Sequence, residues 1–246
     1  MTKRLLTRYY GARRCRSSTR QMGGILVSRA AKLLLDDVPT DRDNGSAMTA
    51  QPDLSRADAT RARLLEAAVT AFAEKGFHAT TTRDIASAAG MSPAALYVHH
   101  KSKEELLYLI SKEGHEHVLR LIREAIASSA MPVDALRRVV RDYAAHHARD
   151  HIGARVINYE LAALAPDHLA EIRRLRHETE DEIRCLVAHG VDAGQFHVRD
   201  PRIATAALLS LGIDLARWYR DGGRWTPDEI GEEYADIALR IVAAEV

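Results

Sequence analysis

Three histidines near the middle of the sequence, His146, His147 and His151, have a spacing that could support metal chemistry. His147 and His151 stand four residues apart, so on a helix they would share one face and could bind one metal ion. Adjacent histidines such as His146 and His147 point about 100° apart on a helix. The sequence places no third ligand at a fixed spacing. Two readings therefore stay open: a metal site, or histidines that are solvated or line a pocket.

Motifs of catalysis are missing from the sequence. It contains no nucleophile elbow, no phosphate-cradling glycine loop and no His-Glu-x-x-His, and its two cysteines, Cys15 and Cys185, form no paired motif. An enzyme that uses histidines and carboxylates for acid–base chemistry remains an alternative. We expect no catalytic residue, no resident metal and no cofactor.

The elements that would position these side chains are helices. From residue 55 onward apolar residues recur at helical spacing, and Pro and Gly fall between the segments. The pattern predicts an all-α fold with nine helices. The first runs from Asp58 to Lys75. Two later ones run from Ala154 to Leu164 and from Pro166 to His189, and Gly190 closes the latter.

Residues 81–100 meet the requirements of a helix-turn-helix. Ala86 is small enough for two helices to cross closely, and Gly90 suits the left-handed conformation of the turn. Leu96 falls where it can anchor the second helix against Ile85. The spacing alone also fits other alanine-rich helical hairpins.

Cap residues mark where these helices begin. Thr81, Ser92 and Ser102 can each accept hydrogen bonds from the free amides of a first turn. Pro93 stands at the first position of a helix. The N–H group that proline lacks would have no hydrogen-bond partner within the helix at this position, so its absence costs nothing. Glu105, three residues after Ser102, would complete a capping box.

The surrounding fifty residues resemble the DNA-binding domain of the TetR family. The resemblance rests on Gly76-Phe77-His78-Ala79-Thr80-Thr81-Thr82-Arg83-Asp84-Ile85-Ala86, on Ala89-Gly90-Met91-Ser92, and on Ala95-Leu96-Tyr97-Val98-His99-His100-Lys101-Ser102-Lys103-Glu104-Glu105-Leu106. His100 departs from the family pattern, which has phenylalanine between the head and the fourth helix. His100 would therefore loosen that junction or pair with a carboxylate.

The resemblance implies a helix-turn-helix domain at 55–102 and an effector-binding and dimerisation domain at 103–246. Its partner would be double-stranded DNA, with the third helix in the major groove. The groove-facing residues would be Ser92, Pro93, Ala94 and Ala95. The phosphate contacts would come from Thr82, Arg83, Tyr97, His99 and Lys103. A core position is the alternative for Tyr97.

The same resemblance gives the body two tasks. The helix at 201–219 and the last helix would form a four-helix bundle with a second copy, making a homodimer. The middle helices would enclose a small-molecule effector. By family analogy its pocket includes Tyr143, His146, His147, Asn158, Tyr159 and Leu161.

A segment near the C-terminus, 214–227, resembles family members that control lipid or steroid breakdown through acyl-CoA effectors. Arg217 and Arg220 would meet the phosphates of such a ligand, and Trp218 or Tyr219 would stack nearby. An arginine-flanked dimer helix is the other reading.

Charge is distributed unevenly along the chain. Residues 1–54 hold ten Lys or Arg against five Asp or Glu, residues 55–103 seven against four, and residues 104–246 eighteen against twenty-five. A basic front and an acidic rear suggest that the front meets a polyanion. We expect a repressor in the cytoplasm, without membrane contact, that an apolar or acyl-CoA-like effector releases from a palindromic operator. An architectural DNA-binding protein is the alternative.

The basic leader, 1–54, has four readings: a disordered segment, an upstream extension of a chain that starts at Met48, a DNA-contacting arm, or a targeting peptide.

Overall fold

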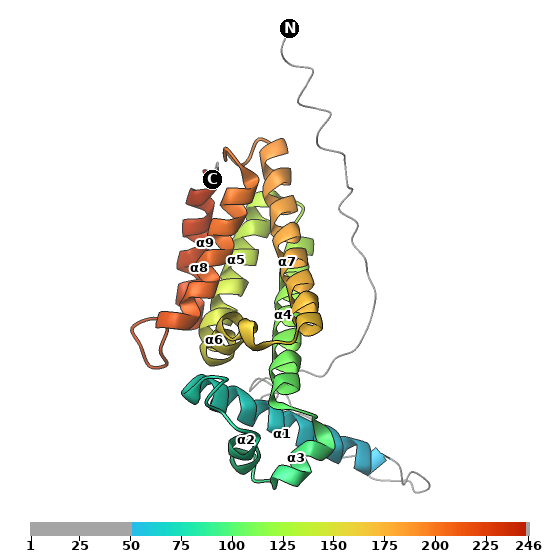
Figure 1. Cartoon of the computed structure of the whole chain (residues 1–246). Coiled ribbons are helices and arrows are strands. Elements are labelled where there is room, and N and C mark those ends of the chain that lie inside the picture. Colours follow the sequence, from blue (N-terminus) through green and yellow to red (C-terminus); the bar gives the residue numbers. More distant parts are fainter. Residues whose placement is uncertain (1–50, 245–246) are drawn as a thin grey trace, which may run out of the picture. The chain divides into compact units, whose positions relative to one another are not determined.

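A computed structural model describes the backbone of residues 51–244 and the side chains of residues 57–244. The predictions for the leader lie outside the described residues, except at its last four positions. The described part contains nine α-helices, one short 3₁₀ helix and no strand (Figure 1). The helices are α1 (Gln51–Lys75), α2 (Thr82–Ala88), α3 (Pro93–His99), α4 (Lys103–Ala127), α5 (Pro132–Arg149), α6 (His151–Tyr159), η2 (Leu161–Ala163), α7 (Pro166–Asp192), α8 (Pro201–Trp218) and α9 (Pro227–Ile241). The predicted all-α fold with nine α-helices is confirmed for this part of the chain.

Helices α1, α2 and α3 form the head, whose core is continuous with buried residues of α4, α6 and α7. Ile85, Ala86 and Leu96 are fully buried, together with Leu64 and Ala68 of α1. Gly90, between α2 and α3, has φ +68° and takes the left-handed conformation that the turn requires. The predicted crossing at Ala86 and the predicted anchor at Leu96 are both present.

A reciprocal pair of hydrogen bonds starts α2. The amide of Asp84 donates to Thr81 Oγ1 over 3.1 Å, and the amide of Thr81 donates to Asp84 Oδ2 over 2.8 Å. Hydrogen bonds that the hydroxyl and the amide of Thr81 donate to the Asp84 carboxylate, followed by the ammonium of Lys75, hold the pKa of Asp84 well below its usual range. Because Lys75 ends α1, its 3.0 Å ion pair with Asp84 also joins α1 to α2.

Helices α4 to α9 form the body, in which α5 packs against α4, α7, α8 and α9. The core on α5 consists of Leu136, Val139, Val140 and Tyr143, all buried. Among the described residues, no helix is long and apolar enough to cross a membrane.

The predicted bounds of three helices differ from the structure, and packing explains the difference at the end of α7. Helix α7 continues past Gly190 to Asp192, and the left-handed residue that follows is Gly194, with φ +74°. A Cβ on Gly190 would lie 2.0 Å from Cδ2 of Phe196, so this glycine makes room for a ring and does not end the helix.

Helix α6 also differs from its prediction over Ala154–Leu164. It begins at His151, only one residue after α5, and it ends at Tyr159, before the separate η2 turn. The break between α5 and α6 lies at Asp150, where no proline or glycine signals it. Helix α1 likewise begins before the predicted Asp58, with Pro52 in its first turn, where a missing N–H costs no hydrogen bond.

Candidate nucleic-acid interface and effector cavity

The start of α3 presents small side chains to solvent. Ser92 Oγ accepts a 3.2 Å hydrogen bond from the amide of Ala95, which fixes the first turn, and Pro93 occupies the first helical position. Ser92, Pro93 and Ala94 are exposed and Ala95 is half-buried, whereas Leu96 is inaccessible and faces α1 and α2. The wall of a DNA major groove could therefore approach the backbone of this turn closely.

Tyr97 stands on the exposed side of α3. Its side chain is 55% exposed, which excludes the alternative of a core tyrosine. The phenol oxygen lies 3.1 Å from Thr82 Oγ1, at the first residue of α2. Arg83 is exposed beside Thr82, and His99 is half-buried at the last turn of α3. Polar side chains from the start of α2 and from the second half of α3 therefore meet on one surface.

The ammonium group of Lys103 is hydrogen-bonded to main-chain carbonyl oxygens of the protein itself. Its Nζ donates hydrogen bonds to the carbonyl oxygens of Phe77 (2.8 Å), His78 (3.3 Å) and Thr80 (2.8 Å), all in the loop between α1 and α2. The ammonium also lies 4.4 Å from the centre of the Phe77 ring. An ammonium has three N–H donors, and each has an acceptor here. Lys103 thus ties the start of α4 to the loop that precedes α2.

His100 is buried between the head and α4, and among the described residues it pairs with no carboxylate. It is 4% exposed, and neither ring nitrogen has a hydrogen-bond partner in the part of the chain that the structure describes. Glu105, whose charge opposes the effect of burial on His100, accepts a hydrogen bond from the amide of Lys101, so the predicted capping box with Ser102 is only half formed. Burial therefore lowers the pKa of His100.

A cavity of about 180 Å³ lies in the body, bordered by five helices and open to solvent at its rim. Its walls are Gly114, His115 and Val118 of α4; Tyr143, His146, His147 of α5 with Asp150; Ala154, Ile157 and Asn158 of α6; Arg173, Arg176, His177, Thr179 and Glu180 of α7; and Leu209 and Ile213 of α8. Four of the predicted effector residues, Tyr143, His146, His147 and Asn158, are brought together here.

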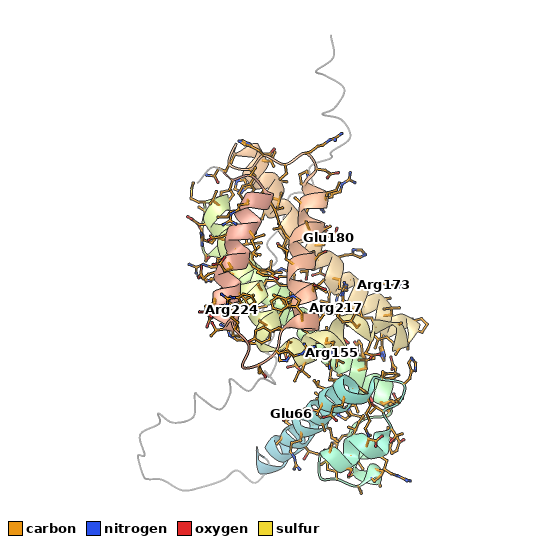
Figure 2. The ribbon with its side chains drawn as sticks, turned by 90° about the vertical axis from the view of Figure 1, so that its left-hand side faces the viewer. Glu66, Arg155, Arg173, Glu180, Arg217 and Arg224 are labelled. Atoms are coloured by element: carbon orange, nitrogen blue, oxygen red, sulfur yellow. The ribbon has the colours of Figure 1, made fainter. Side chains whose placement is uncertain are left out.

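The other predicted effector residues lie elsewhere, and Leu161, which is half-buried, borders neither of the two hollows. Tyr159 and Arg217 line a second hollow of about 300 Å³, between α1, α6 and the end of α8. Trp218 lines neither hollow and is 41% exposed. In Figure 2, Arg155 and Arg217 mark the second hollow and Arg173 and Glu180 mark the rim of the first along α7.

Burial keeps three histidines of the cavity wall, His115, His146 and His147, neutral. Burial lowers the pKa of His115 and of His146 to about 3, and that of His147 to about 4. His147 Nδ1 lies 2.9 Å from the carbonyl oxygen of Tyr143, which can only accept, so Nδ1 carries the proton. These rings offer hydrogen bonds, not charge.

Two arginines on the cavity side of α7 differ in their ion pairing from two arginines on its outer side. Within the described chain, Arg173 and Arg176 have no carboxylate oxygen at ion-pair distance, and Arg176 instead donates a 3.1 Å hydrogen bond to Asn158 Oδ1. On the outer side, Arg174 forms an ion pair with Glu178 and Arg184 forms one with Asp181.

Sequence reasoning missed the contributions of α4 and α7 to the cavity. His115, Val118, Arg173 and Arg176 belong to long amphipathic helices, and only the packing of five helices decides which of their faces borders the hollow. A signal did exist at Gly114, where a Cβ would lie 2.3 Å from Ile157 Cδ1, because a glycine inside a helix can mark a close crossing.

The metal reading of His146, His147 and His151 gains no support. His151 packs its ring on Tyr219, 5.3 Å between centres, and does not border the cavity. Over residues 57–244, no group of three or more His, Cys, Asp or Glu side chains is arranged to hold a metal ion.

Two family models match the chain. Residues 64–108 match the model described as bacterial regulatory proteins, tetR family, and residues 129–242 match the one described as tetracyclin repressor-like, C-terminal domain. The first covers the second half of α1, all of α2 and α3 and the start of α4, and the second covers all helices from α5 onward.

Individual relatives agree with the family models. The transcriptional repressor KstR2 of Rhodococcus jostii is 33% identical over 78% of this chain and 96% of its own length. The crystal structure of a tetR-family regulatory protein from Rhodococcus RHA1 is 41% identical, with a TM-score of 0.72 over 76% of this chain and 98% of that one. The structure of the ketosteroid transcriptional regulator KstR2 of Mycobacterium tuberculosis is 26% identical, with a TM-score of 0.70 over 76% and 95%.

Proposed function

The chain belongs to the TetR family of bacterial regulatory proteins, and from this premise we propose that it is a ligand-responsive repressor that binds a palindromic operator as a homodimer. The observation that carries the proposal is the exposed first turn of α3, beside which Tyr97 and Thr82 are joined on one surface. The relatives named as repressors support the direction of regulation.

The DNA contacts divide into two kinds. Ser92, Pro93, Ala94 and Ala95 face the base edges, where small side chains fit thymine methyl groups. Thr82, Arg83, Tyr97 and His99 hold the phosphate backbone and fix the register. Lys103 is left out of this interface because its ammonium is fully engaged with carbonyl oxygens.

Dimerisation is supported by an exposed face of α8. Ile203 is 72% exposed, and Ala206, Ala207 and Ser210 continue the same face at helical spacing. Small and apolar side chains in a row suit a close contact with a second copy. Two heads related by a two-fold axis would then reach half-sites roughly 34–36 Å apart.

The effector occupies the cavity between α4 and α8 and is an apolar or acyl-CoA-like molecule. Arg217 and Arg220 are exposed at the end of α8 next to Trp218, where phosphates of a CoA group could bind. Tyr219 is only 5% exposed, so Trp218 is the ring available for stacking. The relative described as a ketosteroid regulator favours a lipid-derived ligand.

Fluorescence anisotropy tests the proposal. The protein is titrated against the DNA upstream of its own gene, with random DNA as competitor, and acyl-CoAs are then added. We expect competitor-resistant binding that one acyl-CoA reverses. Specific binding that no compound reverses would remove the acyl-CoA proposal only. Binding that the competitor abolishes, at every genomic fragment tried, would favour the architectural alternative.

A further inference from the structure

Val98, in the second turn of α3, carries an apolar side chain that is almost wholly exposed. Its exposed fraction is 80%, the largest among the large apolar side chains of residues 57–244. Valine has a lower helix propensity than alanine, so α3 gains nothing from a branched side chain at an exposed position. A single exposed apolar residue is common on protein surfaces, and it is the place of Val98 on α3 that distinguishes it.

Val98 points away from the core of the head. Successive residues of an α-helix are about 100° apart, so Ala94 and Val98 each stand about 160° around α3 from Leu96. Leu96 is inaccessible and belongs to one core with Ile85 and Ala86. Ala94, one turn before Val98, is exposed as well. Ala94 and Val98 therefore form an apolar strip along the middle of the outer face of α3.

Polar side chains flank this apolar strip. Tyr97, whose phenol oxygen lies 3.1 Å from Thr82 Oγ1, stands on one side, and the half-buried His99 stands on the other. Residues 55–103 carry seven Lys or Arg against four Asp or Glu, which favours a polyanion as the partner. A major groove has phosphates along both edges and base edges between them. Polar flanks on the phosphates would therefore place the apolar strip over the bases.

An apolar side chain can recognise one base in the major groove. Thymine alone presents a methyl group there, on C5, where cytosine carries a hydrogen atom. Val98 has no side-chain donor or acceptor, so it cannot read the hydrogen-bonding pattern of a base. It can bury a methyl group, and because valine is stiff at χ1 in a helix, the contact orders few rotamers.

We propose that Val98 is a specificity-determining residue of the operator contact, which packs on the 5-methyl group of one thymine in each half-site and thereby selects thymine over cytosine. This inference rests on the proposed function, because it takes α3 to lie in the major groove. It assigns the centre of the outer face of α3, whereas the phosphate contacts belong to its flanks.

Removing single methyl groups from DNA tests the inference. Duplexes that the full chain retains are selected from a random library. Each thymine of the selected half-site is then replaced, in both half-sites, by deoxyuridine, which lacks only the 5-methyl group. At one position we expect the dissociation constant to rise roughly fourfold for each methyl group removed, the effect of exposing one buried carbon. In Val98→Ala the same replacement should have almost no effect. In Ile152→Ala, which shortens an exposed side chain of α6, the rise should persist.

A second comparison uses the unchanged protein. Cytosine at the same position should weaken binding, and 5-methylcytosine should recover part of the lost affinity. The slope of log affinity against log salt should be equal in the unchanged protein and in Val98→Ala, because valine neutralises no phosphate.

Two results would overturn the inference and leave the repressor proposal intact: sequence-specific binding in which no thymine methyl group matters, or an equal loss with deoxyuridine in Val98→Ala. Failure to retain any duplex over random DNA would instead overturn the proposed function, and the inference with it.

Discussion

Arg155 of α6 donates a 2.8 Å hydrogen bond from Nη2 to the main-chain carbonyl oxygen of Ala73, in the last turns of α1. Helix α6 borders the proposed effector cavity through Ala154, Ile157 and Asn158. The carbonyl group belongs to a helix of the DNA-binding head. One side chain thus links the cavity wall directly to the head, at the hollow that Tyr159 and Arg217 also border.

Replacing Arg155 should reduce the coupling between effector binding in the body and operator binding by the head. In Arg155→Met, operator affinity without effector should change less than about twofold, since Arg155 lies away from α3. The coupling free energy between effector and operator should fall by about 1 kcal/mol, the size of one hydrogen bond. Operator dissociation constants with and without the releasing acyl-CoA measure this. Arg174→Met, which removes only an exposed ion pair with Glu178, is the matched control.

Lys103 should position the head without touching DNA phosphates. Lys103→Met should weaken operator binding several-fold, because the loop before α2 loses its three carbonyl contacts, yet leave the salt dependence of binding unchanged. Arg83→Gln should lower the slope of log affinity against log salt by about 1 for each half-site. If Lys103→Met also lowered the slope of log affinity against log salt, that result would support the phosphate contact that the sequence predicts for Lys103.

Local chemistry explains which features the sequence could predict. The caps at Thr81 and Ser92, the left-handed Gly90 and the crossing at Ala86 each depend on residues a few positions apart. Such features follow from side-chain type and spacing. The caps and the turn of the head were therefore predictable, whereas the half-formed capping box at Ser102 and the start of α1 were not.

Distant contacts explain what the sequence could not predict. Gly190 signals a helix end, yet Phe196 folds back on it and the helix continues. His115 is one of several histidines in the sequence, and only α5 and α7 closing over α4 make it part of a cavity. Tyr159 lies one residue after Asn158, but its side chain borders the other hollow.

Mild acid should destabilise the body. Burial lowers the pKa values of His115 and His146 to about 3 and that of His147 to about 4, while the unfolded chain titrates near 6.5. Below pH 6.5 the unfolded state therefore binds more protons than the folded state, and stability falls as pH falls. Each such histidine should cost on the order of 2 kcal/mol between pH 7 and pH 5.

Urea unfolding at the two pH values measures this loss. In His115→Asn the difference in unfolding free energy between pH 7 and pH 5 should shrink by roughly the share of one histidine. His177→Asn should leave the difference unchanged, because its side chain is 77% exposed. Equal pH dependence in all three proteins would show that His115 is protonated in the folded state.

The exposed face of α8 should hold two copies together. Ala207→Glu places a carboxylate in the middle of the row that contains Ile203, Ala206 and Ser210, and across a two-fold axis it meets its own copy, so we expect monomers. A monomer reads one half-site, and its operator affinity should fall at least about a hundredfold while the helix content stays the same. Light scattering and anisotropy measure both effects. Ala170→Glu, an equally exposed change on α7, should remain dimeric and bind normally. A dimeric Ala207→Glu protein with full affinity would place the interface on another face of the body.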